Sequence, residues 1–304
     1  MTVHRSSIPT AACVSIEMDL TTDAVNAGLV SVHGGHTAEF GDGEDSLAAV
    51  VAEYVRQDFD WVGITEHIPP VSDVFLFDED REAGETAASK RARFADYFST
   101  ARLLQSEHRS KLQILVGFET ECCTGYVDHV DELRREFKPD YIVGSVHHVR
   151  DVVIDGRSKW YAEAIACVGG IEELYCEYFD QQYQMMEALR PEVIGHFDLI
   201  RFHDADYHER FRVSEIKDRI WRNLEKAKEI DSILDLNLRA LEKGASEPYV
   251  SRSILEMASE IGVKCVPGDD SHGVATVGRH LGRGIELLEE TGYGVEWPKP
   301  RGCA

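Results

Sequence analysis

Residues 191–198 read Pro-Glu-Val-Ile-Gly-His-Phe-Asp, an apolar pair that runs through a glycine into two polar residues of ligand type. Alternate side chains of an extended strand point to the same face, so His196 and Asp198 would lie on one side of a strand end. An imidazole and a carboxylate placed in this way suit a metal ion. The histidine could equally be a structural residue that bonds a nearby turn, and this stretch alone leaves both interpretations open.

The same arrangement recurs along the chain, where other apolar, strand-like runs end in His, Asp or Glu. These runs are residues 64–67, 115–119, 142–147 and 266–272. One structural histidine is common, but random placement would not favour a repeated position at strand ends. Imidazole and carboxylate ligands without a thiolate suit Zn, Mn or Fe in a hydrolytic site, so the recurrence favours a metal centre.

Segments with apolar residues at helical spacing separate the strand-like runs. The segments predicted to be helical include 47–57, 89–107, 126–137, 213–230, 251–261 and 277–290. Strand and helix alternate roughly seven times, which predicts an α/β fold with a parallel sheet and crossover helices. A β/α barrel with its site at the C-terminal ends of the strands explains why polar residues follow almost every strand. Residues 71–88 are acidic, and we predict a loop at the rim of the site.

The chain has 304 residues and a formal net charge of -23. We predict one domain over residues 29–304, after an N-terminal extension or irregular start at residues 1–28. The acidic excess disfavours binding to polymeric nucleic acid, which depends on Lys and Arg, and likewise to anionic membrane. A small anionic substrate is still compatible with this charge if local arginines or metal ions reverse the field.

The seven cysteines are odd in number and form no Cys-x-x-Cys pair, which argues against a disulfide framework and predicts a cytoplasmic protein. No apolar run is long enough to span a bilayer, and no signal peptide is evident. A covalent nucleophile is also disfavoured. The chain lacks a Gly-x-Ser-x-Gly elbow, and the charge of Glu121 would raise the pKa of the adjacent Cys122 and Cys123.

Several motifs in order along the chain are together quite specific. They are Val-His-Gly-Gly-His-Thr, Gly-Ile-Thr-Glu-His-Ile-Pro, Val-Gly-Phe-Glu, Val-Gly-Ser-Val-His-His-Val, Val-Ile-Gly-His-Phe-Asp-Leu-Ile, Glu-Pro-Tyr and Gly-Asp-Asp-Ser-His-Gly. This series resembles the polymerase and histidinol phosphatase (PHP) superfamily, and most closely its histidinol-phosphate phosphatase branch. The resemblance implies a distorted seven-stranded, TIM-like β/α barrel with two or three divalent metal ions. It also implies hydrolysis of L-histidinol phosphate to L-histidinol and phosphate, in histidine biosynthesis.

The resemblance also implies a set of metal ligands. One metal would be held by His36, Glu119 and Asp270. Glu119 would bridge to a second metal, held also by His147 and His196. A third would be held by His67 and His272.

Two positions depart from the family pattern. The family opens with His-x-His, but Gly34 stands at the first of these positions and His33 lies one residue earlier. His33 could still reach the site, because the glycines that follow permit unusual backbone angles. The loop at residues 40–45 lacks a histidine that the family tends to carry there, and Asp42 or Glu44 could replace it.

Hydrolysis of a phosphate ester also needs a proton for the leaving oxygen and a clamp for the phosphate. Asp198, His203 or His148 could supply the proton, and the sequence does not choose among them. Arg201 and Arg239 follow ligand-bearing strands and are predicted to bind phosphate, since a guanidinium pairs with it bidentately. A surface ion pair is the alternative for each arginine.

Three alternative functions remain open from the sequence. A PHP-type phosphoesterase could act on another small ester, such as a nucleotide or sugar phosphate. An amidohydrolase-like deaminase would need His-x-His on the first strand, which Gly34 breaks. The protein could also be a relic that binds metal but has lost its catalytic activity. Gly34 and the altered loop at residues 40–45 support this alternative.

Overall fold

The computed structural model describes residues 28–303, so all but the last residue of the predicted N-terminal extension (1–28) lies outside the described residues. The strands are β1 (Leu29–Ser31), β2 (Phe59–Ile64), β3 (Gln113–Val116), β4 (Phe118–Glu119), β5 (Ile142–Gly144), β6 (His148–Val149), β7 (Val152–Val153), β8 (Val193–Ile194), β9 (Ile233–Asn237) and β10 (Lys264–Gly268). The longer helices are α2 (Leu47–Arg56), α4 (Ala87–His108), α5 (Tyr126–Phe137), α6 (Ser158–Val168), α7 (Ile171–Leu189), α9 (Ser214–Glu229), α11 (Arg252–Ile261) and α12 (Leu281–Glu290). Short helices are α3 (Asp78–Glu82), α8 (Tyr207–Arg210) and α10 (Arg239–Glu242), with 3-10 turns η1 (Asp73–Phe75), η2 (Leu199–His203) and η3 (Val274–Thr276).

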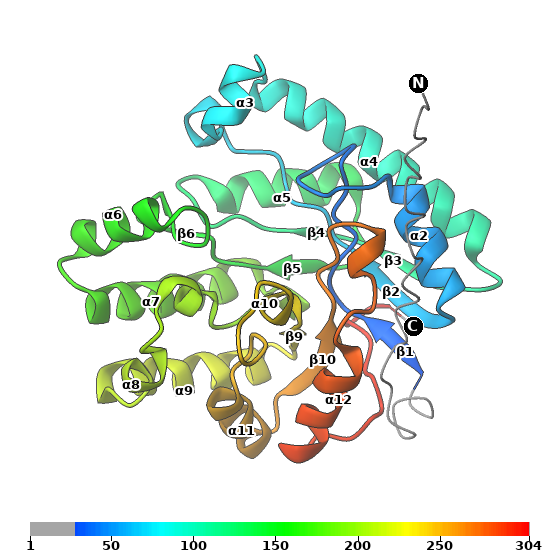
Figure 1. Cartoon of the computed structure of the whole chain (residues 1–304). Helices are drawn as coiled ribbons and strands as arrows, with labels where there is room; N and C mark the ends of the chain where they lie inside the picture. The colour runs from blue at the N-terminus through cyan, green and yellow to red at the C-terminus, as the bar shows by residue number, and fades with distance from the viewer. Residues whose placement is uncertain (1–27, 304) are drawn as a thin grey trace, which may run out of the picture.

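The parallel strands form two sheets. One has the order β1-β2-β3 and the other β10-β9-β8-β5-β4, while β6 and β7 form a separate antiparallel hairpin. The sheets approach each other at both edges. Val32 N donates to Pro267 O at 3.0 Å on one side, and Gly117 alone separates β3 from β4 on the other. Helices surround the strands (Figure 1). The predicted parallel α/β fold is therefore present, but the described strands are not hydrogen-bonded into one closed sheet.

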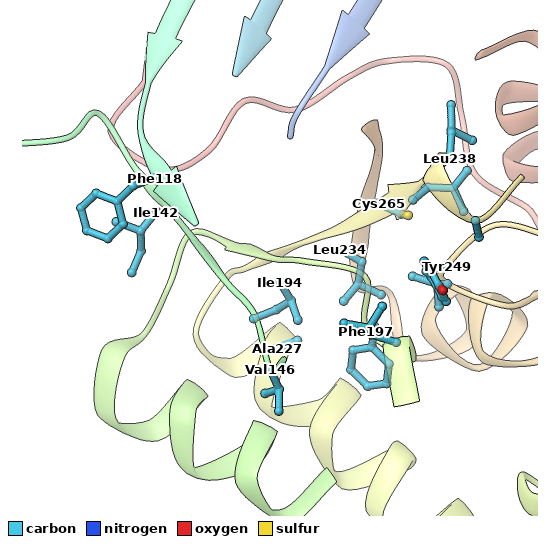
Figure 2. Packing of buried hydrophobic residues seen from close by; sticks show 14 of the residues in the cluster. Phe118, Ile142, Val146, Ile194, Phe197, Ala227, Leu234, Leu238, Tyr249 and Cys265 are labelled. Carbon is cyan, nitrogen blue, oxygen red and sulfur yellow. The ribbon is translucent and has the colours of Figure 1, made fainter. Parts of the chain in front are cut away.

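Two apolar clusters divide the core, and the alternation of side chains along each strand decides which residue joins which cluster. The larger cluster lies between strands and helices. It includes Ile194 of β8 and Leu234 of β9, and Figure 2 shows both beside Ala227 of α9. The smaller cluster takes the alternate residues from both sheets. Its members are Val30, Val32, Trp61, Leu115, Tyr141, Val143, Val193, Ile233 and Val266. The two sheets thus share one inner core.

Most predicted elements agree with the structure, and the exceptions are short. Helix α5 has the predicted bounds, and Ser46 Oγ caps α2 by accepting from Ala49 N at 3.3 Å. Residues 71–88 are not one loop, because η1 and α3 lie within them and α4 begins at Ala87. The β6–β7 hairpin was not predicted. The last helix begins at Leu281 rather than residue 277, since η3 and a turn precede it.

The C-terminal segment, residues 291–303, closes the N-terminal ends of the strands. Trp297 Nε1 donates to Gly28 O at 3.1 Å, just before β1. Arg301 donates to Glu192 Oε1 at 2.9 Å, just before β8. The opposite ends of the strands are left for the polar residues that follow them. Across residues 28–303, no helix has both the length and the apolar character needed to cross a membrane.

Candidate metal centre

The residues predicted to bind metal all lie at the C-terminal ends of the parallel strands. His33, His36 and Asp42 follow β1, His67 follows β2, Glu119 ends β4, His147 follows β5, His196 follows β8, and Asp270 and His272 follow β10. Because parallel strands present their carboxyl ends at one edge, the fold brings residues from distant parts of the chain together. The cluster is buried, apart from the exposed Asp42 and the half-buried His67.

Glu119 lies at the middle of the cluster and is only 1% exposed. Its Oε1 lies 2.8 Å from His196 Nε2 and 3.3 Å from His147 Nε2. Its Oε2 lies 3.1 Å from His67 Nδ1 and 3.6 Å from His33 Nε2. Each oxygen of one carboxylate therefore faces a different pair of imidazoles, which is the arrangement of a carboxylate that bridges two cations.

The spacing of these atoms fits metal ligands. His147 Nε2 and His196 Nε2 lie 3.1 Å apart and converge on the same oxygen of Glu119. Metal–ligand distances of about 2.0–2.1 Å in tetrahedral geometry leave about 3.3 Å between ligand atoms, close to what is observed. Among the described residues, four overlapping groups have ligand atoms that all lie within 4.8 Å of one another. They are His36, Asp42, His67 and His272; His33, His36 and Asp270; His33, Glu119 and His196; and His67, Glu119 and His147.

His33 joins the cluster despite Gly34. Its Nδ1 lies 2.9 Å from Thr65 Oγ1, whose hydroxyl in turn lies 3.4 Å from Gly34 O. Thr65 can therefore donate to the carbonyl and accept from the Nδ1 proton, which leaves the buried His33 Nε2 free of hydrogen bonds as a ligand atom. Gly35 has φ +82°, and a Cβ there would lie 2.7 Å from Ile64 Cδ1. The glycines that follow His33 thus let both histidines face the cluster.

Two further carboxylates orient the histidines, and neither was among the predicted site residues. Glu66 is fully buried, and its Oε1 lies 3.2 Å from His36 Nδ1. Glu121 Oε2 lies 3.0 Å from His147 Nδ1 and 3.3 Å from His148 Nδ1. A carboxylate on one ring nitrogen fixes the ring and leaves the other nitrogen for a metal. Glu66 lies in the motif Gly-Ile-Thr-Glu-His-Ile-Pro, and Glu121 lies two residues after the end of β4, so position near a strand end was the available signal for both.

The charges in the cluster favour a cation. Burial would raise the pKa of Glu119, but the surrounding imidazoles hold it well below its ordinary value. Burial would lower the pKa of His67, but Glu119 and Glu121 raise it to about 9. Burial lowers the pKa of His33 to about 4, because its nearest carboxylates only partly compensate. The carboxylates thus stay ionised and attract protons to the neighbouring histidines, and the same field would hold metal ions.

Asp270 is positioned by a residue that the prediction also left out. Asn237 Nδ2 lies 3.0 Å from Asp270 Oδ2 and 2.9 Å from the buried Asp235 Oδ2. This leaves Asp270 Oδ1, which has no hydrogen bond, at 3.2 Å from His36 Nε2. Asp270 also has φ +46°, in the left-handed region that costs energy for a residue other than glycine. Its adjacent Asp269 is turned away to Ser31 and Tyr54.

Asp198 and Arg201 form a buried pair close to the candidate metal centre. Arg201 Nε donates to Asp198 Oδ2 at 3.0 Å, and its Nη2 donates to Pro248 O at 2.7 Å. The guanidinium lies over the rings of Tyr207 and Tyr249, 4.8 and 4.5 Å from their centroids. Most of the donors that were predicted to bind phosphate are therefore already used within the protein.

The other predicted catalytic residues differ in their surroundings. His203 Nε2 bonds Gly156 O at 2.8 Å, and His203 belongs to none of the four ligand groups among the described residues. Arg239 is half-buried, and its guanidinium makes no hydrogen bond or ion pair with another described residue. His148 is buried beside Glu121 and lines a cavity next to the cluster.

This cavity has a volume of about 440 Å³ and opens beside the candidate metal centre. His67, Glu121, His147 and His148 line it on the side of the cluster. Phe75, Phe77, Glu79 and Asp80 come from the segment at 71–88 that was predicted to border the site. The remaining wall includes Asp42, Pro69, Pro70, Asp155 and Lys243. Its size is that of a small-molecule site.

Comparison with solved structures supports the fold. A structure from Listeria monocytogenes is 26% identical, with a TM-score of 0.72 over 83% of this chain and 98% of that one. A histidinol phosphate phosphatase from Lactococcus lactis subsp. lactis is 19% identical, with a TM-score of 0.67 over 90% of this chain and 97% of that one. The Lactococcus protein was solved with zinc, L-histidinol and phosphate.

Similarity to known protein sequences covers most of the chain. The PHP domain model matches residues 33–239. A Schizosaccharomyces pombe protein named probable histidinol-phosphatase is 33% identical over 82% of this chain and 82% of its own. The histidinol-phosphatase of Saccharomyces cerevisiae is 27% identical over 81% of this chain and 84% of its own. With its strand-end cluster of histidines and carboxylates, this chain belongs to the PHP domain family.

Proposed function

We propose that this protein is a metal-dependent phosphomonoesterase that hydrolyses L-histidinol phosphate to L-histidinol and phosphate, within histidine biosynthesis. The observation that carries the proposal is the convergence of four overlapping ligand groups at strand ends, beside a cavity of small-molecule size. The similarity to histidinol phosphatases over four-fifths of the chain supports the choice of substrate.

The protein binds two or three divalent ions of Zn, Mn or Fe. The donor set supports this choice, since it consists of imidazoles and carboxylates without a thiolate. Glu119 is shared between sites, with His147 and His196 on one side and the pair His33 and His36, with Asp270, on the other. Asp42, His67 and His272 hold a third ion, and Asp42 takes the place of the missing loop histidine. Bound ions supply an activated water and neutralise charge on the phosphoryl oxygens.

The residues of the chain position the ester and move the proton. His148 is the best placed donor of a proton to the leaving oxygen, because it lines the cavity whereas Asp198 is held by Arg201 and Ser251 N. Arg239 is our preferred candidate for the clamp on phosphate, because its guanidinium is not engaged by another described residue. Arg201 instead fixes Asp198 and the backbone at Pro248.

The described residues 29–303 form one domain, and the two sheets form the wall of a distorted seven-stranded barrel. The inner cluster supports this part of the proposal, because residues from both sheets contribute to it. A location in the cytoplasm is supported by the six described cysteines, all of which are free.

The test is phosphate release from L-histidinol phosphate by the purified protein, with Mn or Zn added. A panel of nucleotide, sugar and simple alkyl phosphates is assayed alongside. The proposal predicts a kcat/KM for L-histidinol phosphate that exceeds all others by at least about a hundredfold. Equal or higher values for a nucleotide or sugar phosphate would retain the phosphoesterase and reject its place in histidine biosynthesis. Metal binding without turnover of any ester would favour the relic.

A further inference from the structure

One carboxylate in the cavity beside the metal centre lacks a partner. Five acidic residues line this cavity. Asp80 pairs with Lys90 at 2.5 Å, Glu79 pairs with Arg157, Asp42 lies 3.4 Å from His272 Nε2, and Glu121 contacts His67, His147 and His148. The fifth, Asp155, is half-buried and makes no hydrogen bond or ion pair with another residue in the described part of the chain. A partly desolvated, unpaired charge is costly, and a ligand of opposite charge would relieve that cost.

The loop that carries Asp155 is fixed on both sides. Ile154 N donates to His147 O at 2.9 Å, which ties the loop to a candidate metal ligand. Gly156 O bonds His203 Nε2 at 2.8 Å, which anchors it to η2. These two bonds flank Asp155 directly, so its carboxylate has a defined position relative to the metal centre before any ligand binds. Such pre-organisation reduces the ordering cost of binding.

Two aromatic residues lie in the lining of the same cavity as Asp155. Phe75 and Phe77 line the cavity, and Phe75 lies edge-on to His148 with 6.3 Å between ring centroids. Phe77 stacks on Trp160 with 6.0 Å between centroids, and Glu79 pairs with Arg157. The segment over the cavity is thus joined to the segment that follows Asp155. The cavity combines flat apolar surfaces with one available anionic group, which suits a small ligand that has an apolar or aromatic body and a positive charge.

We propose that Asp155 determines specificity by binding the ammonium group of the leaving alcohol, so that the enzyme selects phosphate esters of amino alcohols. The inference rests on the proposed function, because L-histidinol phosphate carries a primary ammonium and an imidazole near its ester. With the ester at the metal centre, the ammonium pairs with Asp155, and the imidazole lies against Phe75 and Phe77.

The test compares Asp155→Asn with the wild-type, metal-loaded enzyme on two kinds of substrate. The variant keeps the size of the side chain and removes its charge. We expect kcat/KM for L-histidinol phosphate to fall by at least about tenfold, mostly through KM, because the lost contact is one charge-assisted pair. The kcat/KM for p-nitrophenyl phosphate and glycerol 2-phosphate, which lack a cation, should change by less than about twofold.

Asp80→Asn is the matched control, because it changes the charge of the cavity by the same amount but removes a carboxylate already paired with Lys90. It should leave the preference for L-histidinol phosphate nearly unchanged. Equal losses of preference in the two variants would attribute the effect to overall charge and overturn the role of Asp155. A uniform loss on all substrates in Asp155→Asn would overturn it as well.

Binding of L-histidinol separates this inference from the proposed function. Calorimetry on the metal-loaded proteins should show weaker binding of L-histidinol to Asp155→Asn and unchanged binding of inorganic phosphate. If the wild type hydrolyses no phosphomonoester, the proposed function fails, while this difference in affinity would still support an ammonium site. Equal affinity for L-histidinol in both proteins would reject that site whatever the activity.

Discussion

The two ends of the parallel strands are built in opposite ways. At the C-terminal ends, buried polar atoms such as His33 Nε2, His36 Nε2 and Asp270 Oδ1 have no hydrogen-bond partner among the described residues. At the N-terminal ends, the segment at 291–303 supplies partners. Trp297 bonds Gly28 O at 3.1 Å, and Arg301 bonds Glu192 at 2.9 Å.

This difference separates function from stability. Buried polar atoms without partners are costly, so a protein retains them where a ligand will satisfy them. Satisfied hydrogen bonds at the other end hold strand termini together and need no ligand. Substitutions at the C-terminal ends should therefore affect metal binding and turnover first, and those at the N-terminal ends should affect stability first.

The largest effect is expected for Glu119→Gln, which removes the charge shared by the imidazoles of the cluster. Phosphatase activity should fall by at least about a thousandfold, since both metal affinity and the bridge are lost. Bound metal, measured by elemental analysis, should fall too, while the circular dichroism spectrum stays native. Glu192→Gln, at the other end of the strands, is the control and should keep full activity. Comparable activities in the two variants would remove Glu119 from the centre of the site.

Removal of metal should have the next largest effect. Dialysis against a chelator is expected to abolish activity, and added Mn or Zn should restore it. The melting temperature should also fall. A metal ion present at a free concentration of about 1,000 times its Kd contributes about 4 kcal/mol to the free energy of unfolding, and this contribution is lost with the metal. Differential scanning calorimetry of both forms measures this. An unchanged melting temperature after verified loss of metal would show that the cluster needs no ion to be stable.

Loss of a contact between the C-terminal segment and the N-terminal ends of the strands should lower stability but leave catalysis unchanged. Trp297→Ala removes a half-buried ring and its bond to Gly28 O, and the free energy of unfolding should fall by about 2 kcal/mol. Urea denaturation measures this change. The kcat/KM of the metal-loaded variant at low temperature should match the wild type within about twofold. A large catalytic defect with native stability would break the comparison between the two ends.

The smallest effect is expected for pH, which should change the stability and the metal affinity of the metal-free protein. The pKa of His67 is raised from 6.5 to about 9, mainly by Glu119 and Glu121 against the effect of burial. A raised native pKa stabilises the fold fully below 6.5, and this contribution is lost as pH rises through about 9. The metal-free protein should therefore lose stability over this range, while apparent metal affinity rises because fewer protons are displaced. Denaturation and metal titration across this range measure both trends, and Zn affinity that falls with pH would contradict the account.

Local sequence patterns predicted the long elements because their signal is repeated many times. Helix α5 has the predicted bounds, and its apolar positions recur over three turns. Helix α3 is Asp-Glu-Asp-Arg-Glu and has no apolar face, so its sequence resembles that of an acidic loop. The strands of the β6–β7 hairpin have two residues each, which is too short for an alternating pattern.

Local sequence was enough to predict which residues reach the ends of the strands, and hence the composition of the candidate metal centre. Each strand orders its own side chains with a period of two, so this information is local. Which of those polar atoms are left unpaired depends on tertiary packing. It engages Arg201 with Asp198, bonds His203 to Gly156, places Glu66 and Glu121 on imidazoles, and leaves Asp155 unpaired in the cavity. Pairing joins residues that are distant in the chain, and it depends on how the two sheets meet, which no local pattern specifies.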